Sequence, residues 1–329
     1  MDKFTFIDLF AGLGGFRIAL ENIGGTCVFS SEINEHAASI YKHNFGDYPS
    51  GDITKIEASS IPNFDILCGG FPCQAFSIAG KKLGFEDTRG TLFFEICRIV
   101  KERKPKVIFL ENVKNLTLHD KGNTFKTIIS SLEELGYQVS YKILNAKDFG
   151  VPQNRERIII VATLNKKINF NHLITSKINS KIEDILDISN KDYLEESIYT
   201  LLEKSHIKQN KQSGLIFAGF MNKTMRNNVD PSKFYFSRNH RQPNRIYRFD
   251  GTHPTLSSQE SAGRYYVLLK NGKVRKLTIT ECYQLMGFPK TFKLIGSKNN
   301  LFQRIGNSVC VPMIESVAQL IKKEILIDY

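Results

Sequence analysis

The chain has 329 residues, of which 41% are hydrophobic and 24% charged, a balance typical of a globular protein that buries a full core. Its formal net charge of +12 and its pI near 9.3 favour a polyanionic partner, most simply nucleic acid. Charge alone leaves open a basic protein with no special partner. We expect no signal peptide, because Asp8 interrupts the first apolar run, and no uncharged stretch approaches the roughly 18 residues of a membrane span.

The six cysteines are scattered through expected strands and helices, and no two of them form a CxxC pair. This spacing argues against a zinc site and a disulfide framework, so we expect no bound metal and reduced thiols in a cytoplasm. Most of these side chains are expected to be small buried hydrophobes. They are Cys27, Cys68, Cys73, Cys97, Cys282 and Cys310.

The first half of the chain alternates short apolar strands with helices. The expected strands are 4–9, 27–30, 64–70, 107–110, 139–144 and 157–163. The expected helices end near Ile23 and Asn44 and then cover 92–101 and 123–135. Strand–helix alternation of this kind predicts a mostly parallel sheet that is covered on both faces.

The second half changes in texture at about residue 165, where Lys, Asn, Ser and Ile dominate and the periodicity is weak. We expect a helix over 278–287 with Thr280 as its N-cap, and an apolar closing helix over 308–325 that packs back onto the first domain. Two domains are therefore predicted. They are residues 1–164 with 277–329, and a smaller, less regular domain over 165–276.

A glycine loop follows the first expected strand. Glycines between Ala11 and Gly15 let the backbone turn tightly and approach a ligand, although the spacing is not the GxGxxG of dinucleotide binders. Glu32 ends the second strand, where it can accept hydrogen bonds from a ribose diol, and Asp52-Ile53 can hold an adenine ring. The loop alone is equally compatible with a structural turn.

Cys73 follows the third expected strand, in the sequence Phe71-Pro72-Cys73-Gln74. Open α/β sheets place their active sites just past the carboxyl ends of strands, and backbone N–H groups there favour a thiolate. Glu111 ends the next strand. A thiolate can attack C6 of a cytosine, and an acid can protonate N3 to neutralise the charge that develops. Cys73 and Glu111 are therefore a candidate pair for this reaction. A buried structural cysteine is the alternative reading of Cys73 alone.

Two arginines lie at i and i+2 in Arg155-Glu156-Arg157, and an extended segment points both in the same direction. One can hold a pyrimidine O2 or a phosphate, and the other can pair with Glu156 or close the site. A surface charge cluster is the alternative.

The motifs occur in one order: FAGLGG, Glu32, GFPCQ, ENV at 111–113, QNRER at 153–157, and GNSV at 306–309. In this order the chain resembles the DNA cytosine-5 methyltransferases of the bacterial restriction-modification type, over residues 4–163 and 275–320. The resemblance implies an α/β, Rossmann-like class I S-adenosylmethionine-dependent methyltransferase domain with an irregular target-recognition domain. It also implies a cytosine flipped out of duplex DNA, with S-adenosylhomocysteine as the second product.

The family's functional residues carry over by position. The implied catalytic residues are Cys73 as nucleophile, Glu111 as partner of N3, Arg155 and Arg157. The implied cofactor residues are Phe10, Gly12, Leu13, Gly14, Glu32, Ile33, Asp52, Ile53, Pro72, Asn307 and Ser308. The implied DNA contacts are Gln74, Ala79, Lys81, Arg89, Arg238, Arg241, Gln242, Arg245 and Thr255.

Three of these DNA contacts suggest the sequence that is read. Gln242, Arg245 and Thr255 occupy positions that look like recognition residues of one member of the family, so we expect a short site containing 5′-GC. The segment 78–90, rich in Gly and Lys, looks like the family's mobile active-site loop. We also expect a monomer in the cytoplasm of a bacterium, paired in function with a restriction endonuclease.

Three other readings differ in class. A Rossmann oxidoreductase would use the glycine loop and Glu32 but would leave Cys73 and Glu111 without a task. A tRNA cytosine methyltransferase can be built on the same motifs, although the basic middle region favours duplex DNA. A non-catalytic DNA-binding relative is hard to reconcile with an intact catalytic set.

Overall fold

The computed structural model describes residues 3–71, 92–222 and 230–327. The chain folds into two compact units, each described here by itself. Unit 1 comprises Met1–Asn145, Glu156–Thr175 and Ser308–Tyr329, and unit 2 comprises Ala146–Arg155 and Ser176–Asn307.

Unit 1 is built on a six-stranded sheet with the order β2-β1-β3-β4-β7-β5. Its strands are β1 (Phe4–Leu9), β2 (Gly25–Ser31), β3 (Ile66–Gly70), β4 (Val107–Val113), β5 (Gln138–Asn145) and β7 (Glu156–Thr163). Its helices are α1 (Gly15–Glu21), α2 (Glu35–Phe45), α4 (Leu92–Arg103), α5 (Asn123–Glu134) and α8 (Val311–Ile321). Strands β2, β1, β3 and β4 run parallel, whereas β7 is antiparallel to both β4 and β5. The predicted α/β fold with a mostly parallel sheet is therefore confirmed.

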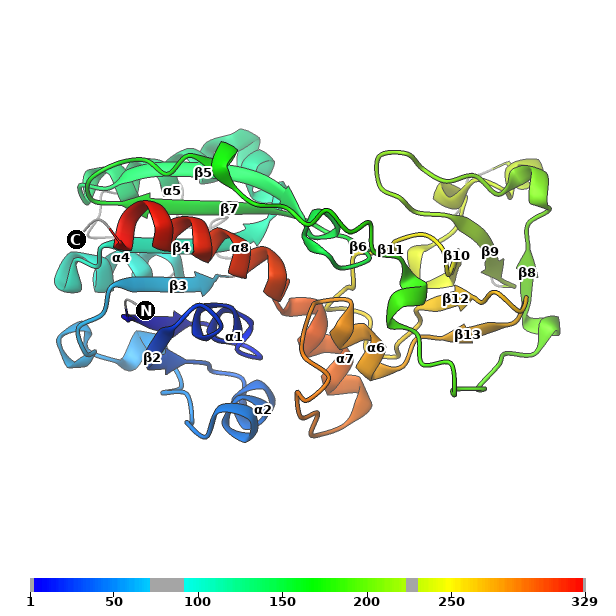
Figure 1. The fold of residues 1–329 in the computed structure, drawn as a ribbon, viewed down its shortest axis with the longest axis horizontal. Helices are drawn as coiled ribbons and strands as arrows, with labels where there is room; N and C mark the ends of the chain where they lie inside the picture. The colour runs from blue at the N-terminus through cyan, green and yellow to red at the C-terminus, as the bar shows by residue number, and fades with distance from the viewer. Residues whose placement is uncertain (1–2, 72–91, 223–229, 328–329) are drawn as a thin grey trace. The chain divides into compact units, whose positions relative to one another are not determined.

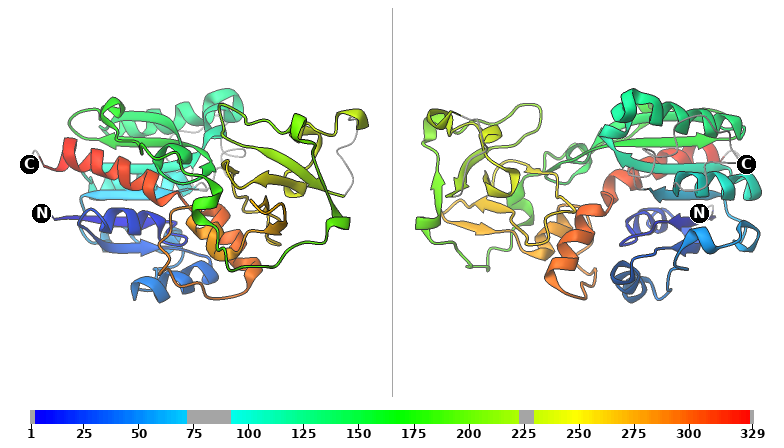
Figure 2. Two further views of the ribbon diagram at one scale, coloured as in Figure 1. Left: turned by 45° about the vertical axis from the view of Figure 1, so that its right-hand side comes forward. Right: turned by 180° about the vertical axis from the view of Figure 1, so that it is seen from behind.

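Helices cover both faces of this sheet, as the alternation predicted. Figures 1 and 2 show α1 and α8 on one face and α4 and α5 on the opposite face. Strands β3, β4 and β7 are almost fully apolar and buried, which a sheet covered on both sides requires, whereas the edge strand β5 carries exposed side chains. Among the described residues, no helix is both long and apolar enough to cross a membrane.

Unit 2 consists of short strands and single 3₁₀ turns. A five-stranded sheet has the order β13-β12-β10-β9-β8, and β11 pairs separately with β6. The strands are β6 (Gln153–Asn154), β8 (Tyr199–Leu201), β9 (Phe217–Met221), β10 (Arg245–Arg248), β11 (His253–Pro254), β12 (Tyr266–Leu268) and β13 (Val274–Lys276). The helices are α6 (Ile279–Gln284) and α7 (Lys298–Asn307).

The compact units have different bounds from the predicted domains. Residues 146–155 and 277–307 group with unit 2, because β6 pairs with β11 and because the amide of Gln153 donates to the carbonyl of Leu285 at 2.8 Å. Residues 165–175 group with unit 1. The functional limits of the two domains stay a prediction.

Three local expectations need correction. The N-cap of α6 is Thr278 rather than Thr280: the Thr278 hydroxyl accepts from the Glu281 N–H, and the Glu281 carboxylate accepts from the Thr278 N–H. Helix α8 begins at Val311 rather than at residue 308, with a proline in its first turn. Helix α7 was not predicted, since its sequence is mostly polar.

A buried ion pair ties α6 to the sheet of unit 2. Arg275 donates through both terminal nitrogens to the Glu281 carboxylate, at 2.8 and 2.6 Å, and each side chain is 1% exposed. The same carboxylate accepts from the backbone N–H groups of Asp187 and Thr278, both at 2.7 Å. All the strong acceptor capacity of Glu281 is thus used inside the fold, as a buried charge requires.

Removing one partner of this pair should destabilise the fold strongly. Glu281→Ala leaves Arg275 buried without its counter-ion, which costs about 3–5 kcal/mol of the free energy of unfolding. Urea denaturation followed by circular dichroism measures this cost. The matched control is Glu196→Ala, which removes an exposed ion pair with Lys273 and should leave the midpoint nearly unchanged. Equal midpoints for the two variants would contradict the structural role of Glu281.

Candidate active site

The carboxyl ends of four parallel strands meet at one edge of the unit 1 sheet. Leu9 at the end of β1 pairs with Ser31 of β2 and with Gly69 of β3, and Gly70 pairs with Glu111 of β4. Whatever follows each strand is therefore gathered at this edge. Open α/β sheets bind their ligands at such an edge.

The glycine loop after β1 has the geometry of a ligand cradle. Phe10, Gly12 and Gly14 all have positive φ, at 56°, 56° and 79°. Phe10 is unusual, because a bulky residue rarely adopts this conformation and such strain concentrates at functional sites. At Gly14 a Cβ would also clash with the ring of Phe45, so glycine is required there.

Glu32 holds this loop in place. One carboxylate oxygen accepts from the N–H of Gly12 at 2.8 Å, and the other accepts from the N–H of Asn34 at 2.7 Å. Ile33, beside it, is 69% exposed, which is a large apolar surface for a side chain next to a strand end. This arrangement fits a nucleoside: a fixed acidic acceptor for hydroxyl groups lies beside an open apolar surface.

The other predicted cofactor residues are distributed as follows. Asp52 accepts from the hydroxyl and the N–H of Thr54, and these bonds lower the pKa of its carboxyl. Leu13 and Ile53 are 1% and 3% exposed, so their side chains pack in the interior. Ser308 lies against the glycine loop: a Cβ at Gly15 would lie 3.3 Å from its hydroxyl. Asn307 is exposed and belongs to unit 2.

Glu111 lies at the centre of the strand-end edge. Its carboxylate is 3.0 Å from Nε of Arg157, and the two side chains are 9% and 11% exposed. Gly70 of β3 lies directly beside it, since a Cβ there would be in van der Waals contact with Oε2 of Glu111 at 3.5 Å. The site therefore contains a buried acid that a cation holds in one orientation.

Asn112 connects this acid to the end of β3. Its side-chain amide donates to the carbonyl of Phe71 at 2.8 Å. Phe71 is the last described residue before the segment that carries the predicted nucleophile. The last described residue before that segment, Phe71, is therefore hydrogen-bonded to Asn112, the residue that follows Glu111. Pro72, Cys73, Gln74, Ala79, Lys81 and Arg89 all lie outside the described residues.

The two arginines of the QNRER motif have different partners. Arg157 pairs with Glu111 in unit 1, while Arg155 is fully buried in unit 2 and donates to the carbonyls of Leu256 and Gly306. Pairing of the second arginine with Glu156 was one of two expected roles, and the structure gives the carboxylate of Glu156 another partner. That carboxylate pairs with Lys114, at 3.0 Å, because alternate residues of β7 point to opposite faces of the sheet.

A buried carboxyl below the glycine loop was missed by the sequence reading. Asp8 of β1 is 1% exposed, and burial raises the pKa of its carboxyl well above the usual value. Within the described part of the chain, its Oδ2 has no hydrogen-bond partner. The sequence does contain a signal for this residue, since Asp8 is the single acid within the apolar strand 4–9.

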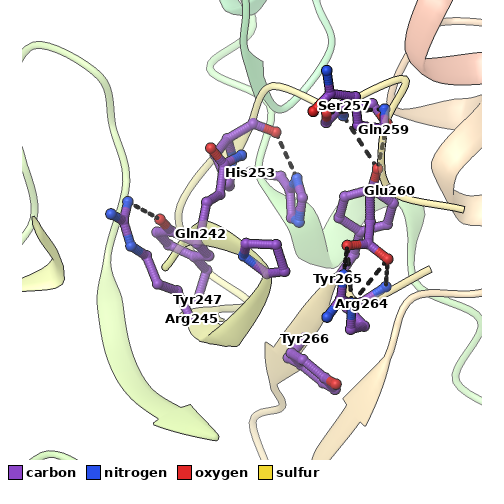
Figure 3. A pocket seen from close by; sticks show the side chains of 12 residues that line it. Gln242, Arg245, Tyr247, His253, Ser257, Gln259, Glu260, Arg264, Tyr265 and Tyr266 are labelled. Carbon is purple, nitrogen blue, oxygen red and sulfur yellow. Dashed lines mark hydrogen bonds and ion pairs between the residues drawn. The ribbon is translucent and has the colours of Figure 1, made fainter. Parts of the chain in front are cut away.

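Unit 2 contains a pocket of about 320 Å³, shown in Figure 3. It brings together two predicted DNA contacts, Gln242 and Arg245, and it is walled by His253 and by tyrosines of β10 and β12. Arg245 is held from behind: Nε and Nη2 donate to the carbonyl of His240, at 3.1 and 2.9 Å. The His240 ring in turn stacks on Phe220 with centroids 4.1 Å apart.

The remaining predicted DNA contacts do not all point outward. The Thr255 hydroxyl donates to the carbonyl of Asn154 at 2.8 Å, and the Thr255 carbonyl accepts from the Gln242 amide at 3.0 Å. Thr255 therefore positions Gln242 rather than standing free. Arg238 and Arg241 are exposed, and the Arg238 guanidinium lies 5.2 Å from the ring centroid of Phe236.

Comparison with known proteins now identifies the class of enzyme. The chain belongs to the C-5 cytosine-specific DNA methylases, whose family model matches residues 4–323. It is 42% identical to the type II methyltransferase M.HhaI of Haemophilus parahaemolyticus, over 95% of this chain and 92% of that protein. It is 43% identical to the type II methyltransferase M.HpaII of Haemophilus parainfluenzae, over 98% and 90%.

Solved structures agree in fold. The crystal structure of the S. pombe Dnmt2 methyltransferase matches with a TM-score of 0.66, covering 98% of this chain and 99% of that one at 20% identity. The family resemblance seen in the motifs is therefore confirmed, and the protein is a DNA cytosine-5 methyltransferase.

The buried Asp8 predicts a dependence of stability on pH. Its pKa is raised in the folded state, so the unfolded chain ionises first and stability is lost as pH rises above the ordinary value of 3.8. Asp8→Asn removes this loss and should raise the melting temperature more at pH 8 than at pH 5. Asp230→Asn is the control, since that acid is exposed with a lowered pKa. A pH-independent effect of Asp8→Asn would refute the assignment.

Proposed function

We propose that this enzyme transfers a methyl group from S-adenosylmethionine to C5 of a cytosine flipped out of a short duplex DNA site. The reaction passes through a covalent bond between Cys73 and C6. The observation that carries the proposal is the buried Glu111, held by Arg157 next to the point where the Cys73 segment leaves the sheet. C6 is inaccessible within a stacked duplex, so the base must leave the helix, at a cost of a few kcal/mol.

Glu111 serves the addition step. As the Cys73 thiolate bonds to C6, negative charge develops at N3 and C5, and a proton donated by Glu111 to N3 neutralises it. Arg157 would restrain the carboxyl during this step, because its Nε lies 3.0 Å from Oε1 of Glu111. A buried acid in a fixed position loses little orientation entropy in the transition state.

The remaining steps restore the base. When bound, S-adenosylmethionine supplies an electrophilic methyl group, to which C5 forms a bond with the electron pair it gained in the addition step. A base then removes the C5 proton, the Cys73–C6 bond breaks, and the thiolate leaves. N3 returns its proton to Glu111, so that neutral 5-methylcytosine is formed. Arg155 is buried in unit 2, where it donates to two backbone carbonyls, which supports a role in holding these segments together rather than in direct proton transfer.

The strand-end edge supports binding of the methyl donor. The Glu32 carboxylate is fixed by Gly12 and Asn34 and would accept from the ribose hydroxyls, and the exposed Ile33 would pack against the adenine. The positive φ of Phe10 and of the glycines after it would let the backbone approach the bound methyl donor closely. Asp52 is oriented by Thr54 and lies on the loop after β2 and α2.

Site choice is assigned to unit 2. Arg245 presents a guanidinium held by the His240 carbonyl, which is the geometry for bidentate reading of guanine O6 and N7. Gln242, positioned by Thr255, lies beside it. We propose a short site that contains 5′-GC. We further propose that a monomer performs the reaction, and that it protects DNA from a partner endonuclease with which it forms no stable complex.

Cys73→Ala should abolish methyl transfer while leaving S-adenosylmethionine binding near normal. Incubation of unmodified plasmid with labelled methyl donor, followed by bisulfite sequencing, gives both the reaction and the site. Cys27→Ala is the matched control, because it removes a free thiol from β2 and should retain activity. Turnover by Cys73→Ala contradicts the nucleophile assignment. Methylation outside GC contexts contradicts the proposed recognition site. Labelling of tRNA but not of plasmid assigns an RNA substrate instead.

A further inference from the structure

A second arginine faces the pocket of unit 2. Arg264 lines the cavity together with Arg245, and Figure 3 shows the two on opposite sides, with His253 between them. Arg264 is not among the residues that the family resemblance carries over. Its position on the pocket wall is therefore not explained by the roles expected from the family.

Glu260 fixes the orientation of Arg264. The Glu260 carboxylate is 4% exposed and accepts from Nε of Arg264 at 3.0 Å and from Nη2 at 2.8 Å. It also accepts from the backbone N–H groups of Ala262 and Arg264, at 3.1 and 3.3 Å. The carboxylate thus sets both the side chain and the local backbone. Such a bidentate pair holds a guanidinium in one plane.

The loop that carries this pair is itself immobilised. Gly263 has φ of 61°, and a Cβ there would clash with the ring of Phe302 on α7. The hydroxyl of Tyr265 bonds to the backbone of Ser257 at 3.2 Å, which closes the loop at its base. A rigid loop presents Arg264 to the pocket with little entropy left to lose on binding.

The unused part of Arg264 faces outward. Its bonds to Glu260 occupy Nε and Nη2, and no group in the described part of the chain bonds Nη1. The side chain is 40% exposed. Arg245 is also held through Nε and Nη2, by a carbonyl oxygen, while its Nη1 lies 3.5 Å from the hydroxyl of Tyr247. Two guanidinium groups, each held along one edge, therefore face one cavity.

We infer that Arg264, positioned by Glu260, is a second base-reading residue that contacts the major-groove edge of a guanine in the DNA site. This inference rests on the proposed function, and in particular on unit 2 as the part that reads DNA. A phosphate contact needs only charge, which a flexible lysine supplies. A buried carboxylate that fixes the plane of Arg264 supplies geometry, which matters for the paired acceptors O6 and N7. The recognised site should accordingly contain a second guanine besides the one read by Arg245.

The test compares the site preference of wild-type enzyme and of Arg264→Lys. Plasmid DNA is methylated to low conversion, and bisulfite sequencing gives the rate at each cytosine for every flanking base. Arg264→Lys keeps the positive charge but removes the paired N–H donors of the guanidinium. Discrimination between guanine and the other bases at one position should therefore fall about 10- to 100-fold. Glu260→Gln should give a smaller loss at that same position, because Arg264 keeps a weaker acceptor.

The matched control is Arg248→Lys. Arg248 is also clamped by a carboxylate, with Nε 2.7 Å and Nη2 2.5 Å from Asp250, but it does not line this pocket. Its substitution should leave discrimination unchanged. S-adenosylmethionine binding and the melting temperature, measured for each variant, separate loss of reading from loss of fold, and Arg264→Met serves if the lysine variant unfolds.

Each outcome decides the inference. A wild-type site with a single guanine, or an unchanged preference in Arg264→Lys, overturns it. A uniform loss of DNA affinity at all sites, with the slope of log affinity against log salt reduced by about 1, assigns Arg264 to a phosphate and also overturns it. Absence of any C5 methylation by the wild-type enzyme refutes the proposed function instead, so the two failures are distinguishable.

Discussion

The parallel pairing of β3 with β4 is the constraint on which the rest of the active site depends. It places Gly70 opposite Glu111, and the next residue, Asn112, bonds the carbonyl of Phe71. A buried acid and the start of the Cys73 segment are thereby fixed at one sheet edge. Backbone hydrogen bonds between two buried strands hold this register, so Glu111 and Asn112 are aligned by the core.

Electrostatic preorganisation recurs through both units. Glu111 is held by Arg157 in unit 1, while in unit 2 Arg245 is held by a carbonyl and Arg264 by Glu260. In each case one edge of a guanidinium is bound within the protein. For the two arginines of the pocket, this leaves the other edge oriented for a ligand, so the cost of ordering a long side chain is met during folding rather than during binding.

The sheet and the catalytic motifs were predictable because they depend on local patterns. Apolar runs that end in glycine or an acid define both the strands and the positions of Glu32 and Glu111. Helix α7 was not predictable, since its sequence is mostly polar. The Glu260–Arg264 pair joins residues only four apart, but it depends on a loop conformation with positive φ at Gly263 that the local pattern does not define. Asp8 is visible in the sequence as an acid within an apolar strand, but its raised pKa follows from its burial in the fold.

The covalent step is the central claim, and one measurement tests it directly. A duplex carrying 5-fluorocytosine at the methylated position blocks release of the enzyme, because fluorine cannot leave C5 as a proton does. With S-adenosylmethionine present, mass spectrometry should find the protein joined to this duplex, with the bond on Cys73 and its formation slowed in Glu111→Gln. Methylation of ordinary DNA without any such adduct, or an adduct on another residue, would contradict the account.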